Sequence, residues 1–121
     1  MNQKPAYSKF IDTIKKEEFI SFFSSQKPET WFSERELHEY KFPGNAQSLA
    51  GRFLIKRTIG DYIKNCRDIH EIEILNNEFG KPEILLGRNI RHAIELTGIK
   101  KICCSISHSR NFITSLTIFC F

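Results

Sequence analysis

The sequence lacks any long run of apolar residues. No segment approaches the roughly 18 unbroken apolar residues that a membrane span requires, and the first residues contain no apolar stretch typical of a signal peptide. The chain has 121 residues, of which 40% are hydrophobic and 26% are charged, and this suits one soluble domain with a single core. We therefore expect one domain over residues 1–121, no membrane partner and a cytoplasmic location.

Cysteine is scarce, and its spacing excludes a zinc site. The chain has four cysteines, at Cys66, Cys103, Cys104 and Cys120, and no separation between them is one that zinc sites use. Cys103 and Cys104 are adjacent, so on a strand their side chains would point to opposite faces. We expect buried free thiols in a reducing compartment.

The positive charge is concentrated in one segment. The net charge is +4, and residues 45–67 combine a single acidic side chain, Asp61, with five basic ones: Arg52, Lys56, Arg57, Lys64 and Arg67. Such a segment suits a phosphate-rich ligand or an acidic protein partner, and the alternative is a merely solvated helix face. No aromatic residues suited to base stacking stand among the basic positions, so a nucleic acid is not an expected partner.

Apolar periodicity predicts helices in the first half of the chain. Residues 10–25 repeat apolar side chains at three- and four-residue steps, and residues 33–40 begin with a capping-box pattern. A break at 43–45 precedes a longer helix over 46–65, in which Gly60 is a point of kinking or ending.

Strand patterns dominate the second half. We expect a short helix over 89–96, ended by Gly98, and a hairpin whose loop is 108–111. The helices precede the strands, which indicates an α+β fold in which an antiparallel sheet packs against the long helix. The expected strands of this sheet are 69–75, 82–86, 102–107 and 113–119.

Four short motifs carry the functional information, and their order matters more than any one of them. They are Phe32-Ser33-Glu34-Arg35-Glu36-Leu37, Leu49-Ala50-Gly51-Arg52-Phe53, Gly80-Lys81-Pro82 and Ser105-Ile106-Ser107-His108-Ser109. In this order and spacing, they resemble the holo-acyl-carrier-protein synthase family of 4′-phosphopantetheinyl transferases.

The resemblance implies a transfer reaction. Members of this family move the 4′-phosphopantetheine arm of coenzyme A to a serine of an acyl carrier protein, and 3′,5′-adenosine bisphosphate leaves. The expected partners are therefore coenzyme A, as donor, and an acyl carrier protein. Family members of this length assemble as homotrimers with active sites at subunit interfaces.

The resemblance also implies site residues. Arg52 and Lys56 would contact coenzyme A phosphates, Arg52 through bidentate hydrogen bonds and Lys56 as a point charge. Ser107 and His108 would add phosphate contacts, whereas the alternative for His108 is an ordinary turn histidine. The expected catalytic residues are Lys56, Arg57 and His108. Gly80 and Pro82 would shape the pocket for the adenosine end, although a plain hairpin turn explains them too.

Three positions depart from the family pattern. In the family, Mg²⁺ lies between the diphosphate and two carboxylates. One is a Glu, where this chain has Arg57, and the other belongs to an N-terminal Gly-x-Asp segment that this chain lacks. Asp12 is the acid nearest to that position, and Asp61 replaces a Lys.

The departures leave the metal ligands undetermined, and we expect no magnesium beside Arg57. Arg57 could itself supply charge to the diphosphate, or it could point to solvent or pair with Asp61. Two hypotheses remain. The chain is a transferase of the holo-synthase type with unusual charge chemistry, which we favour, or it is an inactive relative that binds the carrier protein or coenzyme A.

Overall fold

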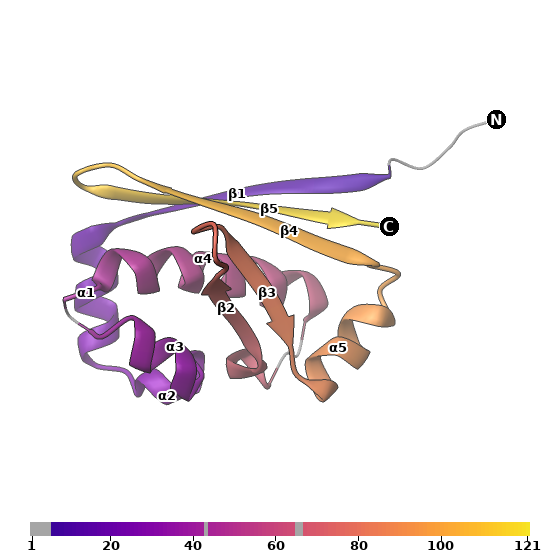
Figure 1. Cartoon of the computed structure of the whole chain (residues 1–121), viewed down its shortest axis with the longest axis horizontal. Helices are drawn as coiled ribbons and strands as arrows, with labels where there is room; N and C mark the ends of the chain where they lie inside the picture. The colour runs from indigo at the N-terminus through magenta and orange to yellow at the C-terminus, as the bar shows by residue number, and fades with distance from the viewer. Residues whose placement is uncertain (1–5, 43, 65–66) are drawn as a thin grey trace.

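The protein is described by a computed structural model, which covers residues 6–42, 44–64 and 67–121 (Figure 1). Pro43 and Cys66, which entered the sequence predictions, lie outside the described residues. The elements in chain order are β1 (Tyr7–Lys15), α1 (Lys16–Ser24), α2 (Pro28–Trp31), α3 (Glu34–Glu39), α4 (Ala46–Ile63), η1 (Ile69–Glu71), β2 (Ile72–Asn76), β3 (Pro82–Leu86), α5 (Arg88–Glu95), β4 (Lys101–His108) and β5 (Phe112–Cys120).

A three-stranded antiparallel sheet forms one layer. Its strand order is β1-β5-β4, so the two ends of the chain pair with each other through β1 and β5. Side chains alternate along β5: those at Ile113, Ser115, Thr117 and Phe119 are buried, and those between them are half-buried. The helices lie on the buried side of this sheet, and none of the described helices covers the other side (Figure 1).

Helix α4 runs under the sheet and separates two apolar clusters. Gly51 lets the helix approach β4 closely, because a Cβ atom at this position would collide with the Ile106 side chain. One cluster packs α1 and the residues around α3 against α4, and the other packs β2 and α5 against it. The buried members of the first are Phe19, Phe23, Phe32, Ala46, Leu49, Ala50, Phe53, Leu54 and Ile113, and those of the second are Ile55, Ile59, Ile72, Ile74, Ile90, Ile94, Ile99 and Phe119.

Strands β2 and β3 form a separate two-stranded sheet. They pair antiparallel, from Ile72 opposite Leu86 to Asn76 opposite Pro82. Gly80 has a φ of +78°, a left-handed conformation that glycine adopts without strain, in the turn between them. Pro82 begins β3, as its missing N–H predicts.

Two sequence predictions about the fold are wrong. The helix over 10–25 is a strand, β1, followed by the shorter helix α1. Phe10 and Ile14 are four residues apart, a spacing that fits one face of a helix and one face of a strand equally well. Hydrogen-bonded pairing with β5 stabilises the strand. The single four-stranded sheet is also wrong, because β2 and β3 pair only with each other, and β1 completes the sheet of β4 and β5.

The remaining helices and strands lie close to their predicted positions, except that residues 69–71 form the 3-10 helix η1, so the strand expected over 69–75 begins at Ile72. Helix α3 begins with a complete capping box from Ser33 to Glu36, α4 and α5 lie where expected, and β4 and β5 form a hairpin. Helix α4 does not end at Gly60 but continues to Ile63, whereas Gly98 follows α5 with a φ of +87°, as predicted. The predicted α+β class, with an antiparallel sheet packed against a long helix, is confirmed.

The described cysteines and helices bear on two further predictions. Cys103, Cys104 and Cys120 are free thiols, and each is half-buried rather than fully buried. No helix among residues 6–42, 44–64 and 67–121 combines the length and apolar character needed to cross a membrane.

The contact at Gly51 generates a stability prediction. Gly51→Ala places a methyl group against Ile106, so we expect the free energy of unfolding to fall by about 1–3 kcal/mol in urea denaturation. Gly60→Ala is the matched control on the same helix. Its nearest contact is the flexible end of Ile69 at 3.2 Å, so we expect a change within about 1 kcal/mol. Equal effects of the two substitutions would contradict this packing.

Candidate functional site

A buried ion pair between Glu36 and Lys56 joins three elements. Lys56, on α4, donates from Nζ to a carboxylate oxygen of Glu36 on α3 and to the backbone oxygen of Trp31 at 2.8 Å. The other Glu36 oxygen accepts from the backbone N–H of Ile74 on β2 at 3.0 Å, and the first also accepts from the Ser33 N–H. Neither charged side chain is exposed. The pair therefore ties α3, α4 and β2 together.

The surroundings of Lys56 shift its proton equilibrium. Desolvation by burial lowers the pKa of Lys56 to about 8, and the nearby Glu36 carboxylate opposes this shift. The ammonium group also lies 4.8 Å from the centre of the Phe32 ring. The hydrogen bonds of this ammonium group are made to other atoms of the same chain.

Arg52, one turn earlier on α4, is also internal. Only 3% of the residue is exposed. Its guanidinium donates to the backbone oxygens of Ile74 at 2.7 Å and Ser48 at 2.9 Å, and to the Tyr40 hydroxyl at 2.7 Å. A further hydrogen bond reaches Asn76 at 3.0 Å. Burial lowers the pKa of Arg52 from its usual value.

These contacts limit what Arg52 and Lys56 offer to a ligand. The structure places both head groups inside the chain, so the alternative of a solvated helix face does not hold for them. Their predicted contact with coenzyme A phosphates stays a prediction, because this arrangement gives both side chains partners of their own. Their evident role is to fix α4 relative to β2.

Arg57 lies at the surface and forms a bidentate ion pair with Asp12. Its Nε donates to Asp12 Oδ2 at 2.9 Å, and its Nη2 donates to Oδ1 at 2.8 Å. The two side chains are 35% and 26% exposed. Arg57 thus joins α4 to β1 at the edge of the sheet. Its partner is Asp12 rather than Asp61, although Asp61 lines the same surface hollow of about 450 Å³.

The residues around Arg57 do not fit magnesium. The acid that the sequence placed near the metal position, Asp12, uses both oxygens on the guanidinium. Glu73 is also engaged, because its carboxylate accepts hydrogen bonds from Ser33 at 2.7 Å and from Arg35 at 3.1 Å. Mg²⁺ requires oxygen ligands in octahedral geometry and is repelled by a cation in the same place.

Ser107 and His108 lie at the exposed end of β4, beside the β4–β5 hairpin. Ser107 pairs in register with Thr114, and His108 with Ile113. Both side chains are open to solvent. They are therefore free to meet a ligand, and they lie at the edge of the sheet opposite to Asp12.

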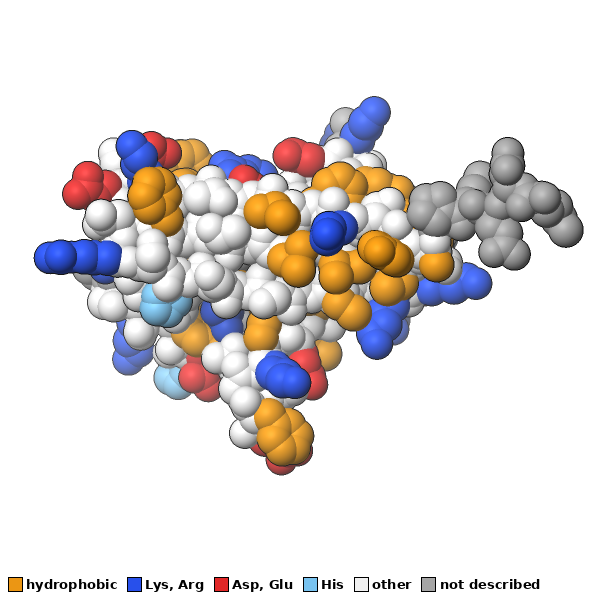
Figure 2. Space-filling view, turned by 90° about the horizontal axis from the view of Figure 1, so that it is seen from above, with side chains coloured by type: hydrophobic (Ala, Val, Ile, Leu, Met, Phe, Trp, Pro, Cys, Tyr) orange, Lys and Arg blue, Asp and Glu red, His pale blue; other side chains and the backbone are white. Residues whose placement is uncertain are grey.

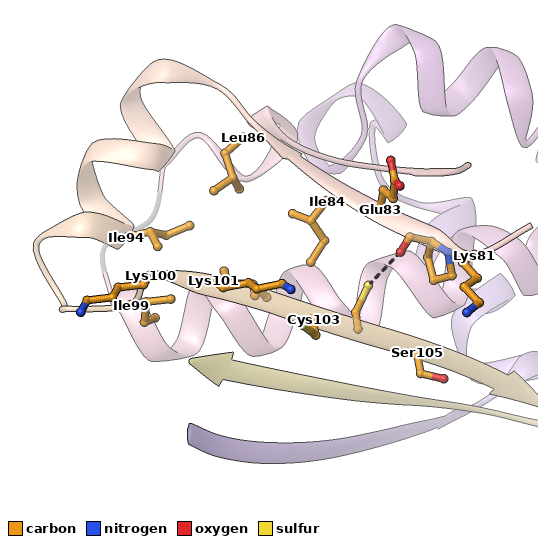
Figure 3. A pocket seen from close by; sticks show the side chains of 13 residues that line it. Lys81, Glu83, Ile84, Leu86, Ile94, Ile99, Lys100, Lys101, Cys103 and Ser105 are labelled. Atoms are coloured by element: carbon orange, nitrogen blue, oxygen red, sulfur yellow. Dashed lines mark hydrogen bonds between the residues drawn. The ribbon is translucent and has the colours of Figure 1, made fainter. Parts of the chain in front are cut away.

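A groove of about 740 Å³ separates β3 from β4 (Figure 3). Pro82 and Lys81 lie at one end near Ser105, and the Pro82 carbonyl accepts a weak contact from the Cys104 thiol at 3.9 Å. Burial raises the pKa of this thiol to about 11. Isoleucines and Leu86 form the apolar part of the lining, and lysines stand along it: Ile84, Ile94, Ile99, Ile102, Lys81, Lys100 and Lys101.

The predicted site residues therefore fall into three groups. Arg57 lies at the β1 edge of the sheet with Asp12, whereas Ser107 and His108 lie at the β4 edge, and strand β5 runs between these two edges. Pro82 lies across the groove from Cys104 and Ser105 of β4, with Gly80 in the adjoining turn. Arg52 and Lys56 form the third group inside.

Sequence reasoning missed the role of Glu36 and the partner of Arg57. Glu36 belonged to a recognised motif, but only as a helix start. A signal was present, because Lys56 follows directly on the apolar run Phe53-Leu54-Ile55, and a lysine buried in such a run needs an acidic partner. Asp12 was noted as the nearest acid, but the misassigned helix over 10–25 hid its position.

Comparison with known proteins supports one family. No protein-family model matches the chain. The holo-[acyl-carrier-protein] synthase of Chlorobaculum parvum is 40% identical over 80 residues, which are 63% of this chain and 62% of that protein. The synthase of Halothermothrix orenii is 32% identical over 92 residues, covering 72% of this chain and 73% of that protein. The Helicobacter pylori synthase, solved with coenzyme A, matches with a TM-score of 0.73 and 19% identity over 93% of this chain and 99% of that chain.

The fold and the sequence similarity together define a 4′-phosphopantetheinyl transferase by class. The chain belongs to the holo-[acyl-carrier-protein] synthase family. The resemblance drawn from the four motifs is confirmed.

The buried pair generates a second stability prediction. Lys56→Met leaves the Glu36 carboxylate buried without a cation, so we expect a loss of about 3–5 kcal/mol in the free energy of unfolding. Adding Glu36→Gln should recover part of this loss. Arg35→Ala is the control, since it breaks an ion pair in which the Arg35 side chain is 68% exposed, and it should cost at most about 1 kcal/mol. A small effect of Lys56→Met would contradict the structural role.

Proposed function

We propose that this chain transfers the 4′-phosphopantetheine group of coenzyme A to a serine of an acyl carrier protein. In this step the serine oxygen forms a bond to the phosphorus that carries the pantetheine arm. The bond from that phosphorus to 3′,5′-adenosine bisphosphate breaks, and the bisphosphate takes the electron pair. The serine proton passes to solvent or to a nearby base. The observation that carries the proposal is membership of the synthase family over most of the chain.

Coenzyme A fits the β4 side of the molecule best. The groove between β3 and β4 offers apolar side chains for an adenine ring and lysines for phosphate charge, and Pro82 lines its wall. Ser107 and His108 continue from this groove along β4, with exposed side chains that can donate to phosphate oxygens. The related Helicobacter pylori synthase was solved with coenzyme A, which supports this choice of donor.

The predicted residues take two kinds of role in this proposal. His108 and Arg57, which are accessible, would touch the reacting phosphates. Lys56 and Arg52 would act as positioning residues, because their internal contacts hold α4 and β2 in place. Gly80 would permit the turn that presents Lys81 and Pro82.

A complete site would need two copies of the chain. Arg57 and His108 lie at opposite edges of the three-stranded sheet, with β5 between them. A neighbouring protomer that brings its β1 edge to the β4 edge of this one would unite the two groups. We therefore include the homotrimer in the proposal, with the active site shared between subunits.

The uncovered face of the sheet supports association. Tyr7 and Ile11 on β1 are 57% and 69% exposed, and they share this face with Leu116 and Ile118 of β5. Figure 2 shows that face, where hydrophobic side chains gather over the sheet. A contiguous apolar surface of this kind is typical of an interface. A cytoplasmic location, where coenzyme A and carrier protein would both be met, belongs to the same proposal.

Transfer is tested by mass spectrometry. Incubation with coenzyme A and an apo-acyl carrier protein should add one 4′-phosphopantetheinyl group to the carrier. His108→Ala should lower kcat/KM by about 10- to 150-fold, the cost of one hydrogen bond to a charged group. His92→Ala, on the exposed side of α5, is the matched histidine control and should change nothing. Carrier or coenzyme A binding without any transfer would instead establish the inactive relative.

Assembly is tested by light scattering. At micromolar concentration we expect a mass three times that of the chain. Ile11→Lys introduces charge on the uncovered sheet face and should give monomers, and transfer should be lost with the trimer. Leu96→Lys, which changes a residue 76% exposed at the end of α5, should leave the trimer intact. A monomeric wild-type protein that is fully active would contradict the shared site.

A further inference from the structure

The Arg57–Asp12 pair includes the position at which the family pattern has a metal-binding Glu. The motif resemblance puts Arg57 at the position of that Glu, and the structure shows that Asp12 faces it from β1 with both carboxylate oxygens engaged. Replacing Arg57 by a carboxylate would therefore set two acids against each other at the edge of the sheet. Two such acids are the ligand set that the family pattern uses.

The net charge of the Arg57–Asp12 pair equals that of the metal site in the family pattern, although different groups supply it. Two carboxylates and one divalent cation sum to zero, and so do one carboxylate and one guanidinium. The fork of Arg57 supplies the cation covalently, and a bidentate pair with a carboxylate is geometrically specific. The pair therefore satisfies Asp12 without any ion from solution.

Arg57 also keeps hydrogen-bonding capacity for an anion. A guanidinium has five N–H donors, and the two bonds to Asp12 use one on Nε and one on Nη2. The remaining donors are on the Nη atoms, and among the described residues none of them has a partner. The side chain is 35% exposed and borders the hollow of about 450 Å³.

We infer that the Arg57 guanidinium stands in for the divalent cation in this chain, with Asp12 as its positioning residue. The site excludes Mg²⁺ and receives the diphosphate of the donor through the free N–H groups of Arg57. The second half of this statement rests on the proposed function, and the first half does not. Asp61, which borders the same hollow, limits how much negative charge can gather there.

The metal half is tested with Mn²⁺ alone, monitored by electron paramagnetic resonance and calorimetry. The wild-type protein should show no Mn²⁺ site at this edge. Arg57→Glu should create one Mn²⁺ site, with an affinity at least about tenfold above any weak, non-specific Mn²⁺ binding by the wild-type protein. The double variant Asp12→Asn/Arg57→Glu retains the new acid but lacks its partner, so it should lose the site.

A charge control completes the metal experiment. Lys41→Glu makes the same change of charge on an exposed loop and should create no Mn²⁺ site. The inference is overturned if the wild-type protein binds Mn²⁺ at a site that Asp12→Asn removes. It is equally overturned if Arg57→Glu binds no better than the wild type, because the two positions would then not form a metal site.

The ligand half is tested by calorimetry with coenzyme A. We expect the same affinity in excess chelator and in millimolar magnesium, and Arg57→Gln should weaken binding by about 10- to 150-fold. Arg57→Lys should restore only part of it, because a point charge lacks the fork. A magnesium requirement would overturn the inference. If coenzyme A does not bind under any condition, the proposed function and the ligand half fail, while the Mn²⁺ result decides the metal half separately.

Discussion

The structure depends most on the buried pair of Glu36 and Lys56. One carboxylate accepts from an ammonium and from the backbone of β2, so α3, α4 and β2 share a single charged centre inside an apolar core. A buried charge without its partner strongly lowers the free energy of unfolding. Displacing any one of the three elements would separate the pair, so their relative positions are tightly constrained. Arg52 repeats the same connection between α4 and β2 one turn away.

This internal framework presents the accessible groups at the surface. Because α4 is fixed beneath the sheet, Arg57 lies at the β1 edge, where it forms an ion pair with Asp12. The opposite edge offers the groove, the end of β4 and His108. One chain thus carries two separate parts of the proposed site, one at the β1 edge and one at the β4 edge of the sheet. The uncovered apolar face of the same sheet offers a surface through which two copies could associate and bring these parts together.

The sequence predicted the family, the α+β class and the elements with strong local signals, such as the capping box at Ser33 and the turn at Gly80. It failed at β1, because spacing that fits a helix can also fit a strand, and only pairing with β5 decides. The same error hid the Arg57–Asp12 pair, whose members are 45 residues apart. Burial of Lys56 was missed because charge was interpreted as exposure, whereas pairing with Glu36 permits burial.

The central claim is that Arg57 replaces a divalent cation beside Asp12. It is tested most directly by a crystal structure of the wild-type protein grown with coenzyme A and Mn²⁺, with data collected at the manganese absorption edge. The account predicts a diphosphate contacting Arg57, an intact bidentate pair with Asp12 and no anomalous peak beside that carboxylate. An anomalous peak between Asp12 and the diphosphate, with Arg57 turned away, would contradict it.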